Sequence, residues 1–507
     1  MTWSRKRKAV SSAAKVEELL TNNMQESVQL PDLLSTKLSS GQRDEQMQAC
    51  ALLASLEMES LLGKSDILPR LLGCINGGDA VVAAEAASVL RIWSSGNARL
   101  LYAHCVLPRM IQLLPACLTT LERISELEKS DVQVFEHFLV SLLLVIWSFV
   151  EEVPAAINQI NDSPVVSLSC LILERASFLE EETIVVMLQL LLCASEENQE
   201  KLYANAADRV RLEALLQRRT GNLDCHSAIL SFGLLSVISS ECTCENVLQL
   251  FSVVEREVSL EMLRDLLEML TNFISEVEFE SFQDHFANIL LAKLAANPEA
   301  TEVMNRGQGC LMNLILAQPA ALSVEAKQNI WTWALCEALP TAASAVSAID
   351  PTNPASAINA ANTTSTLAGT CELLRNLLLC SLGEHELKYT MEDIGRLQQI
   401  CNANIANDSI VANLASIPAI LCKEIDVPWL YSTVYSLFDK SRPLRTILAV
   451  AEIIEELTNR DAIETSLRNV LKSRRPSVIE SCASEMATAG NDEFDYIVSV
   501  LDAALND

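Results

Sequence analysis

Histidine and cysteine are the side chains from which a catalytic or metal site would be built, and the histidines form no recognisable site in this chain. No histidine pairs with a Cys or Ser in a nucleophile arrangement. The sequence contains no GxxxxGKS/T phosphate loop and no GxGxxG, GxSxG or HExxH motif. We therefore expect no enzyme, no cofactor, and histidines that lie at the core edge or on the surface. The five histidines are His104, His137, His226, His285 and His385.

The 16 cysteines are scattered along apolar runs. This distribution is typical of reduced intracellular thiols that serve as small hydrophobic residues. The one close pair, Cys242 and Cys244, lacks a second pair at the spacing of a zinc site. We expect no metal site.

A repeated phrase indicates the elements that must position any binding residues. LPDLL at Leu30 returns as LPRLL at Leu68 and as LPRMI at Leu107, a spacing of about 40 residues. Pro is tolerated in the first turn of a helix, and a break such as Gly77-Gly78 suits the left-handed conformation that closes one. Each unit is therefore predicted to be a short helix, a turn and a longer apolar helix. The sequence predicts an all-α fold, an armadillo/HEAT-repeat α-solenoid wound into a right-handed superhelix.

Two apolar runs, residues 138–150 and 183–194, are shorter than the roughly 18 residues of a membrane span. We expect both to be buried repeat helices, with no membrane as partner. The first residues are basic and polar, so we expect no secretory signal.

The net charge of −29 bears on the class of partner. A strongly acidic surface repels nucleic acid and attracts basic protein segments. We therefore expect a basic protein as partner and no direct contact with nucleic acid.

Charge and composition divide the chain into parts. The predicted parts are a basic tail (1–15), armadillo-like repeats (16–254), an acidic segment (255–284) and HEAT-like repeats (285–507) with a loop at 340–366. In the tail, Arg5, Lys6, Arg7 and Lys8 are consecutive. They form either a nuclear localisation signal or a solvated end. In the acidic segment, Glu276, Glu278 and Glu280 either attract a basic partner or form the wet face of a helix.

Two tryptophans carry the side-chain chemistry of peptide binding. Trp93 and Trp147 lie late in successive long helices, and each is followed by a serine, Ser148 in the second case. In armadillo-type solenoids the third helix of each unit lines a concave groove, where Trp packs on aliphatic stems of an extended peptide. Glu151 and Glu152 follow one turn after Trp147 and could pair with Lys or Arg of the partner. The alternative is that both tryptophans are core residues.

Several stretches resemble the symportin family, nuclear import chaperones of 5S-rRNA-binding ribosomal proteins. They are VIWSFVEEVPAAINQI (145–160), SEENQEKL (195–202), MNRGQGCLMNLI (304–315), MEDIGRLQQICNANIANDSIVANLASIPAILCKE (391–424) and LYSTVYSLFDKS (430–441). The resemblance implies an armadillo half joined to a HEAT half. It also implies a basic ribosomal protein as cargo, an importin as partner, and shuttling between nucleus and cytoplasm.

The chain departs from the family in three places. Ile92 and Ser148 stand where a groove Asn is expected, the acidic insert is short, and the tail has no Pro-Tyr pair. The segment SRKRK instead looks like a basic signal read by importin α. The sequence therefore predicts a carrier that binds a basic ribosomal protein of the large subunit and escorts it into the nucleus. A generic armadillo/HEAT scaffold or trafficking adaptor in the cytoplasm is the alternative.

Overall fold

The computed structural model describes residues 30–56, 58, 61, 66–221, 223–239, 244–274, 283–317, 322–347, 354–381, 387–420, 427–439, 441–460, 462–485 and 492–506. Within these residues the regular structure is helical throughout, and no strand occurs among them. The chain packs as two compact units, Met1–Glu241 and Cys242–Asp507. The prediction of an all-α fold is confirmed for these residues.

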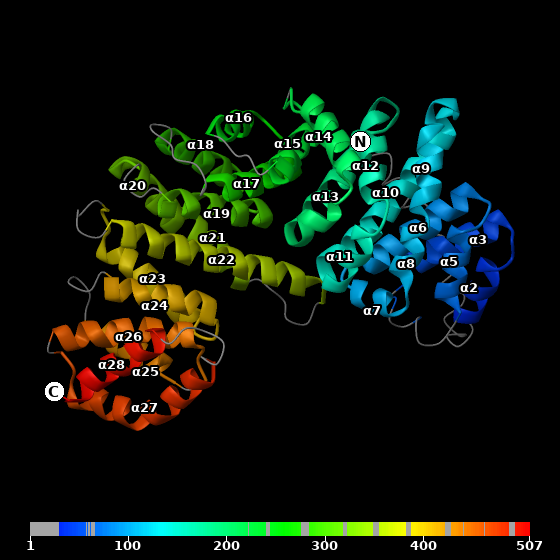
Figure 1. Cartoon of the computed structure of the whole chain (residues 1–507). Helices are drawn as coiled ribbons and strands as arrows, with labels where there is room; N and C mark the ends of the chain where they lie inside the picture. Colours follow the sequence, from blue (N-terminus) through cyan, green and yellow to red (C-terminus); the bar gives the residue numbers. More distant parts are fainter. Residues whose placement is uncertain are drawn as a thin grey trace. The chain divides into compact units, whose positions relative to one another are not determined.

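In the first unit, groups of shorter helices separate the longest helices (Figure 1). They are α2 (Leu30–Leu38), α3 (Arg43–Leu53), α5 (Ile67–Ile75), α6 (Ala80–Ser94), α7 (Ala98–Ala103), α8 (Val106–Ile111), α9 (Leu114–Glu122), the 3-10 turn η1 (Ile124–Glu126), α10 (Lys129–Glu152), α11 (Pro154–Asn161), α12 (Val165–Glu174), the 3-10 turn η2 (Ala176–Phe178), α13 (Glu181–Leu202), α14 (Ala206–Arg219) and α15 (His226–Ser239).

The helices of the second unit follow the same plan. They are α16 (Cys244–Val254), α17 (Leu260–Ile274), α18 (Gln283–Ala296), α19 (Thr301–Ala317), α20 (Val324–Trp333), the π-helical turn η3 (Ala334–Ala338), α21 (Leu339–Ser347), α22 (Pro354–Cys380), α23 (Met391–Ala403), α24 (Asp408–Ile420), α25 (Val427–Leu437), α26 (Leu444–Asn459), α27 (Thr465–Glu485) and α28 (Asp492–Asn506).

The repeated phrase forms the short helix of each predicted unit, at α2, α5 and α8. Its leucines are core residues: Leu34, Leu71 and Leu107 are each fully buried. The longer helices α3, α6 and α10 follow at the expected places. Burial on this scale is what fixes one unit against the next, so the phrase belongs to the scaffold and not to a contact surface.

The break between α5 and α6 differs from the expectation. Neither Gly77 nor Gly78 adopts a positive φ; among the described glycines that conformation occurs at Gly41 and Gly96. The turn is instead secured by Asp79, whose Oδ1 accepts hydrogen bonds from Val81 N (3.0 Å) and Val82 N (3.2 Å). An N-cap of this kind supplies an acceptor for amides that have no partner inside the helix.

Long helices form one row in each unit. In the first unit α6, α10, α13 and α15 lie side by side, and in the second unit α17, α19, α22, α24, α26 and α28 do (Figure 1). By length and composition α10 could cross a membrane, but half of its most apolar stretch is buried against its neighbours. Residues 138–150 and 183–194 thus lie in buried repeat helices, α10 and α13, as predicted.

The loop predicted at residues 340–366 is wrong over its described part. Residues 340–347 belong to α21 and residues 354–366 to α22. The many alanines favour helix. Pro354 is the first residue of α22, where a missing N–H costs nothing, and Pro340 follows the π-helical turn η3, which continues directly into α21. Polar composition was therefore misleading about local structure here.

Two further boundaries differ from the prediction. The first unit ends at Glu241 and not at residue 254, because α16 packs with α17 and α18. Much of the predicted acidic segment is the amphipathic helix α17, whose apolar side is buried. The residues Arg5, Lys6, Arg7, Lys8, Glu276, Glu278 and Glu280 lie outside the described residues.

Candidate protein-binding face

One face of the long helices α6, α10 and α13 is left uncovered by the packing. Its side chains are partly exposed or exposed, and successive ones are three, four or seven residues apart. This spacing aligns them along one side of each helix. We call this set the open face. It comprises Val81, Glu85, Ser88 and Ile92 on α6, His137, Leu144, Trp147 and Glu151 on α10, and Val185, Gln189 and Leu192 on α13.

A serine pair sets the register between α6 and α10. The hydroxyl oxygens of Ser94 and Ser148 lie 3.1 Å apart. Ile92 stands two residues before the first serine, and Trp147 stands directly before the second. Because each residue rises by about 1.5 Å along a helix, the two side chains reach the open face at nearly the same level.

A buried carboxylate sets the register between α10 and α13. Glu136 Oε1 accepts hydrogen bonds from Glu180 N (2.6 Å) and Thr183 Oγ1 (3.2 Å). Helix α13 begins at this contact and lies beside the rest of α10. Counted from this contact, Trp147 on α10 and Leu192 on α13 are nearly the same number of residues along their helices. The two side chains therefore lie at the same level to within about one helical turn.

The middle of the open face therefore has one exposed or partly exposed apolar side chain on each of its three helices. We call this set, Ile92, Trp147 and Leu192, the apolar patch; acidic side chains precede and follow it along the helices. Ile92 is 44% exposed, and Trp147 and Leu192 are partly exposed. Glu85 and Glu151 stand about two turns before Ile92 and one turn after Trp147. An indole can pack on the aliphatic stem of Lys or Arg and attract its cationic head. The patch thus suits an extended segment that contains basic residues.

Trp93 does not belong to this face. It is 2% exposed, and its indole Nε1 donates a hydrogen bond to Leu53 O (3.2 Å) at the end of α3. It follows Ile92 by one residue, so it is turned about 100° around the axis of α6, toward the preceding unit. The prediction that Trp93 contacts a partner is wrong; it is a core residue whose N–H needs a buried acceptor.

Ser148 and Glu152 also serve the fold. Ser148 lies between α6 and α10, where its Oγ donates to Leu144 O (3.0 Å). The Glu152 carboxylate accepts hydrogen bonds from Gly96 N (3.0 Å) and Ala98 N (3.2 Å) at the start of α7. A carboxylate there satisfies free amides at the positive end of the helix dipole. The prediction that Glu152 pairs with a partner is wrong, whereas Glu151 is exposed on the open face.

Carboxylates from one helix secure the start of another at several joints. Besides Glu152 and Glu136, Glu181 accepts from Ser227 N (2.8 Å) at α15, and Asp284 accepts from Ser323 N (2.9 Å) before α20. Burial raises the pKa of Glu136, and the hydrogen bonds it accepts oppose the rise. Part of the acidic content of the chain is therefore structural.

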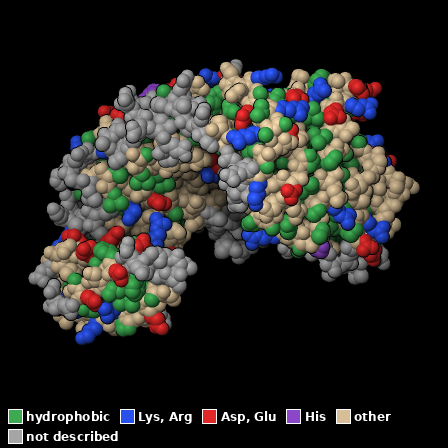
Figure 2. Space-filling view, viewed as in Figure 1, with side chains coloured by type: hydrophobic (Ala, Val, Ile, Leu, Met, Phe, Trp, Pro, Cys, Tyr) green, Lys and Arg blue, Asp and Glu red, His purple; other side chains and the backbone are tan. Residues whose placement is uncertain are grey.

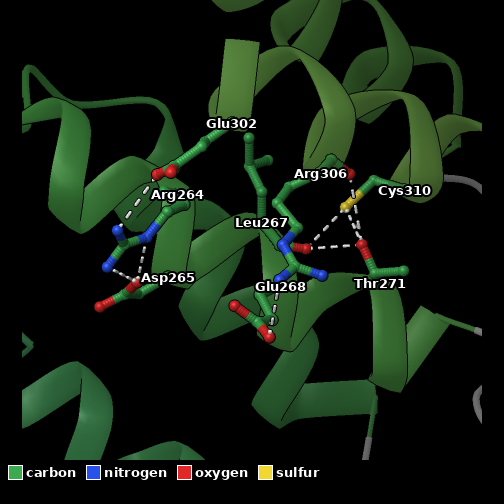
Figure 3. Close-up of polar contacts among 8 residues, drawn as sticks. All are labelled: Arg264, Asp265, Leu267, Glu268, Thr271, Glu302, Arg306 and Cys310. Carbon is green, nitrogen blue, oxygen red and sulfur yellow. Dashed lines mark hydrogen bonds and ion pairs between the residues drawn. The ribbon is translucent and has the colours of Figure 1, made fainter. Parts of the chain in front are cut away.

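Ion pairs and side-chain hydrogen bonds connect neighbouring long helices of the second unit. Figure 3 shows the joint of α17 and α19, where Arg264 lies 2.7 Å from Asp265 and 3.3 Å from Glu302, and Arg306 lies 3.3 Å from Glu268. Further along, Arg445 contacts Glu372 (3.6 Å), Arg375 Nε donates to Ser416 Oγ (2.9 Å), and Tyr496 OH donates to Glu455 (2.6 Å). Sequence reasoning missed the pairs that join two helices because their members are tens of residues apart.

Charges are also interspersed on the molecular surface. On the face drawn in Figure 2, Lys and Arg side chains alternate with Asp and Glu side chains. Exposed pairs of this kind contribute only about 0–1 kcal/mol each. Acidic side chains therefore form no single large patch among the described residues of the drawn face.

The thiols and histidines show no arrangement for catalysis among the described residues. Burial raises the pKa of Cys50, Cys117, Cys170 and Cys310 to about 12, so these thiols stay protonated and unreactive near neutral pH. His285 Nε2 lies 2.8 Å from Glu255 Oε1 on the surface. No group of three or more potential metal ligands occurs in the described part of the chain.

No protein-family model matches the chain, and no curated protein does. Similar solved structures are armadillo/HEAT-repeat proteins. One, from a study of a phosphorylation switch between cadherin and β-catenin, has a TM-score of 0.39 at 12% identity and covers 94% of either chain. SYS-1 has a TM-score of 0.39 at 10% identity, covering 95% of this chain and 99% of that one. The karyopherin Kap121p bound to Pho4p has a TM-score of 0.32 at 12% identity; 94% of this chain matches 45% of Kap121p.

Proposed function

We propose that this protein is a carrier that binds a basic segment of another protein on the open face of α6, α10 and α13. The observation that carries the proposal is the apolar patch at Ile92, Trp147 and Leu192, bordered by Glu85 and Glu151, in a chain of net charge −29. Lys and Arg side chains have a long aliphatic stem that can pack on the apolar side chains and a cationic end group that can pair with the carboxylates.

The cargo that we propose is a 5S-rRNA-binding ribosomal protein of the large subunit, which the carrier escorts into the nucleus. Support comes from the resemblance of residues 145–160, 304–315 and 391–424 to the symportin family. In this proposal an importin reads the signal Arg5-Lys6-Arg7-Lys8, and the carrier returns to the cytoplasm afterwards.

The binding experiment uses the full chain and a basic N-terminal peptide of such a ribosomal protein. We expect binding that weakens as salt rises, because the charges are exposed and screened. Trp147→Ala should weaken it by about tenfold or more, the loss typical of an interface aromatic anchor. Val210→Ala is the matched control, since Val210 is 64% exposed on α14, away from the open face. An affinity that changes neither with salt concentration nor in Trp147→Ala would overturn the proposal.

A cytoplasmic scaffold or trafficking adaptor is the second candidate. It is favoured by the structural use of acids such as Glu136, Glu152 and Glu181, which leaves less charge for a basic cargo. Deletion of residues 1–9, followed by imaging in cells, separates the two. The carrier loses nuclear entry on deletion, whereas a scaffold is cytoplasmic with or without these residues.

A further inference from the structure

Helix α27 contains a segment whose side chains match what Arg-directed protein kinases recognise. Its sequence is Arg474-Arg475-Pro476-Ser477-Val478. Kinases of this class pair their acidic residues with guanidinium groups two and three residues before the acceptor serine, and they seat an apolar side chain after it. Ser477 is partly exposed and has all three features around it.

In the folded chain, the two arginines and the valine already contact or pack against other parts of the second unit. Arg474 donates from one terminal nitrogen to Tyr435 O and Phe438 O, both at 2.9 Å, at the end of α25. Arg475 forms an ion pair with Asp502 of α28, and Val478 is fully buried. A kinase can therefore read the segment only after this part of α27 has left its neighbours.

The helix is weak at this turn. Pro476 lies inside α27, and because proline has no N–H, the carbonyl of Lys472 receives no helical hydrogen bond from it. Ser477 Oγ donates to Arg474 O (3.0 Å), which adds one side-chain bond in the same turn. Local opening of α27 is thus favoured at residues 474–478.

We propose that Ser477 is a phosphorylation site for an Arg-directed kinase, gated by opening of α27, and that its phosphate holds the C-terminal helices apart. In the reaction Ser477 Oγ forms a bond to the γ-phosphorus of ATP while the bond from that phosphorus to ADP breaks. The serine proton passes to the kinase. The phosphate then stands one turn from Arg474 and attracts its guanidinium, which leaves the carbonyls of Tyr435 and Phe438 without their donor.

The test treats the full chain with the catalytic subunit of cyclic-AMP-dependent protein kinase and ATP, with phosphate located by mass spectrometry. We expect phosphate on Ser477 and none at that position in Ser477→Ala. Ser473→Ala, which removes an exposed serine one turn away, should leave the rate unchanged. A peptide of residues 468–483 should react at least tenfold faster than the chain.

Gating is tested by releasing Arg475. Asp502→Asn should raise the rate at Ser477 several-fold, while Asp495→Asn, an exposed position on the same helix, should not. The phosphorylated chain should exchange the amides of α25 and α27 faster than the unmodified chain. The proposal is overturned if neither the chain nor Asp502→Asn accepts phosphate where the peptide does, if chain and peptide react equally fast, or if exchange in α25 is unchanged.

Discussion

Ser94 Oγ lies 3.1 Å from Ser148 Oγ, so the dipeptides Trp93-Ser94 and Trp147-Ser148 meet across α6 and α10. Their tryptophans nevertheless have different environments. Trp93 is buried and bonded to Leu53 O, whereas Trp147 is partly exposed on the open face. The same dipeptide therefore serves the core in one unit and a surface in the next.

This difference predicts opposite effects of two alanine substitutions. Trp93→Ala should lower the free energy of unfolding by about 3–5 kcal/mol, because it leaves a cavity and removes the indole hydrogen bond to Leu53 O. Trp147→Ala should cost much less stability and act on binding instead. Urea unfolding followed by circular dichroism measures both. Equal losses of stability would contradict the assignment.

The Glu152 contact predicts a local effect at α7. Glu152→Ala should destabilise by about 1 kcal/mol, as loss of a helix cap does, and should speed hydrogen exchange at the amides of Gly96 and Ala98. Glu151→Ala is the matched control, because Glu151 is exposed on the open face. Protection at Gly96 that survives in Glu152→Ala would show that the carboxylate does not hold this turn.

The raised pKa of Glu136 predicts a pH dependence. Its ordinary value is 4.5, and burial raises it in the folded chain. Above pH 4.5 the folded state thus holds this proton more than the unfolded state does, so this group's contribution to stability falls as pH rises to the folded pKa. Glu136→Gln keeps an acceptor oxygen and removes the charge. The variant should gain stability relative to the parent as pH rises through that window, and parallel curves would contradict the assignment.

Two glycines of α19 predict a contrast in packing. A Cβ on Gly307 would lie 2.4 Å from Leu294 Cδ2, inside the contact of α18 with α19, whereas a Cβ on Gly309 would find its nearest neighbour at 3.4 Å. Gly307→Ala should cost about 1–3 kcal/mol through overpacking. Gly309→Ala should be neutral or stabilising by up to about 1 kcal/mol. Thermal unfolding of both variants checks the contrast.

The scaffold could be predicted from sequence because its signal is repeated. The phrase at Leu30, Leu68 and Leu107 marked α2, α5 and α8, and the apolar runs after it marked the long helices. A loop was predicted at residues 340–366 because small polar side chains and prolines are typical of loops. In the structure Pro354 begins α22, and Pro340 follows the π-helical turn η3.

The candidate site was only partly predictable. Trp147 and Glu151 could be assigned to an exposed face from the sequence. The burial of Trp93 could not, because it depends on which side of α6 faces the core: Trp93 is buried, whereas the preceding residue, Ile92, is exposed. The partners of Glu152 are Gly96 and Ala98, more than fifty residues away, and no local pattern connects them. Side-chain contacts between repeats depend on register, which the sequence does not state.

The carboxylates that secure neighbouring helices also limit how this array can change in evolution. Glu136 lies on α10 and accepts hydrogen bonds at the start of α13. Glu181 lies on α13 and accepts a hydrogen bond at the start of α15. Deleting only part of a repeat would leave an acid without amides or amides without an acid. Each joint between repeats therefore consists of a carboxylate on one helix and free amides at the start of the next. A gain or loss of repeats must keep a carboxylate opposite each set of amides.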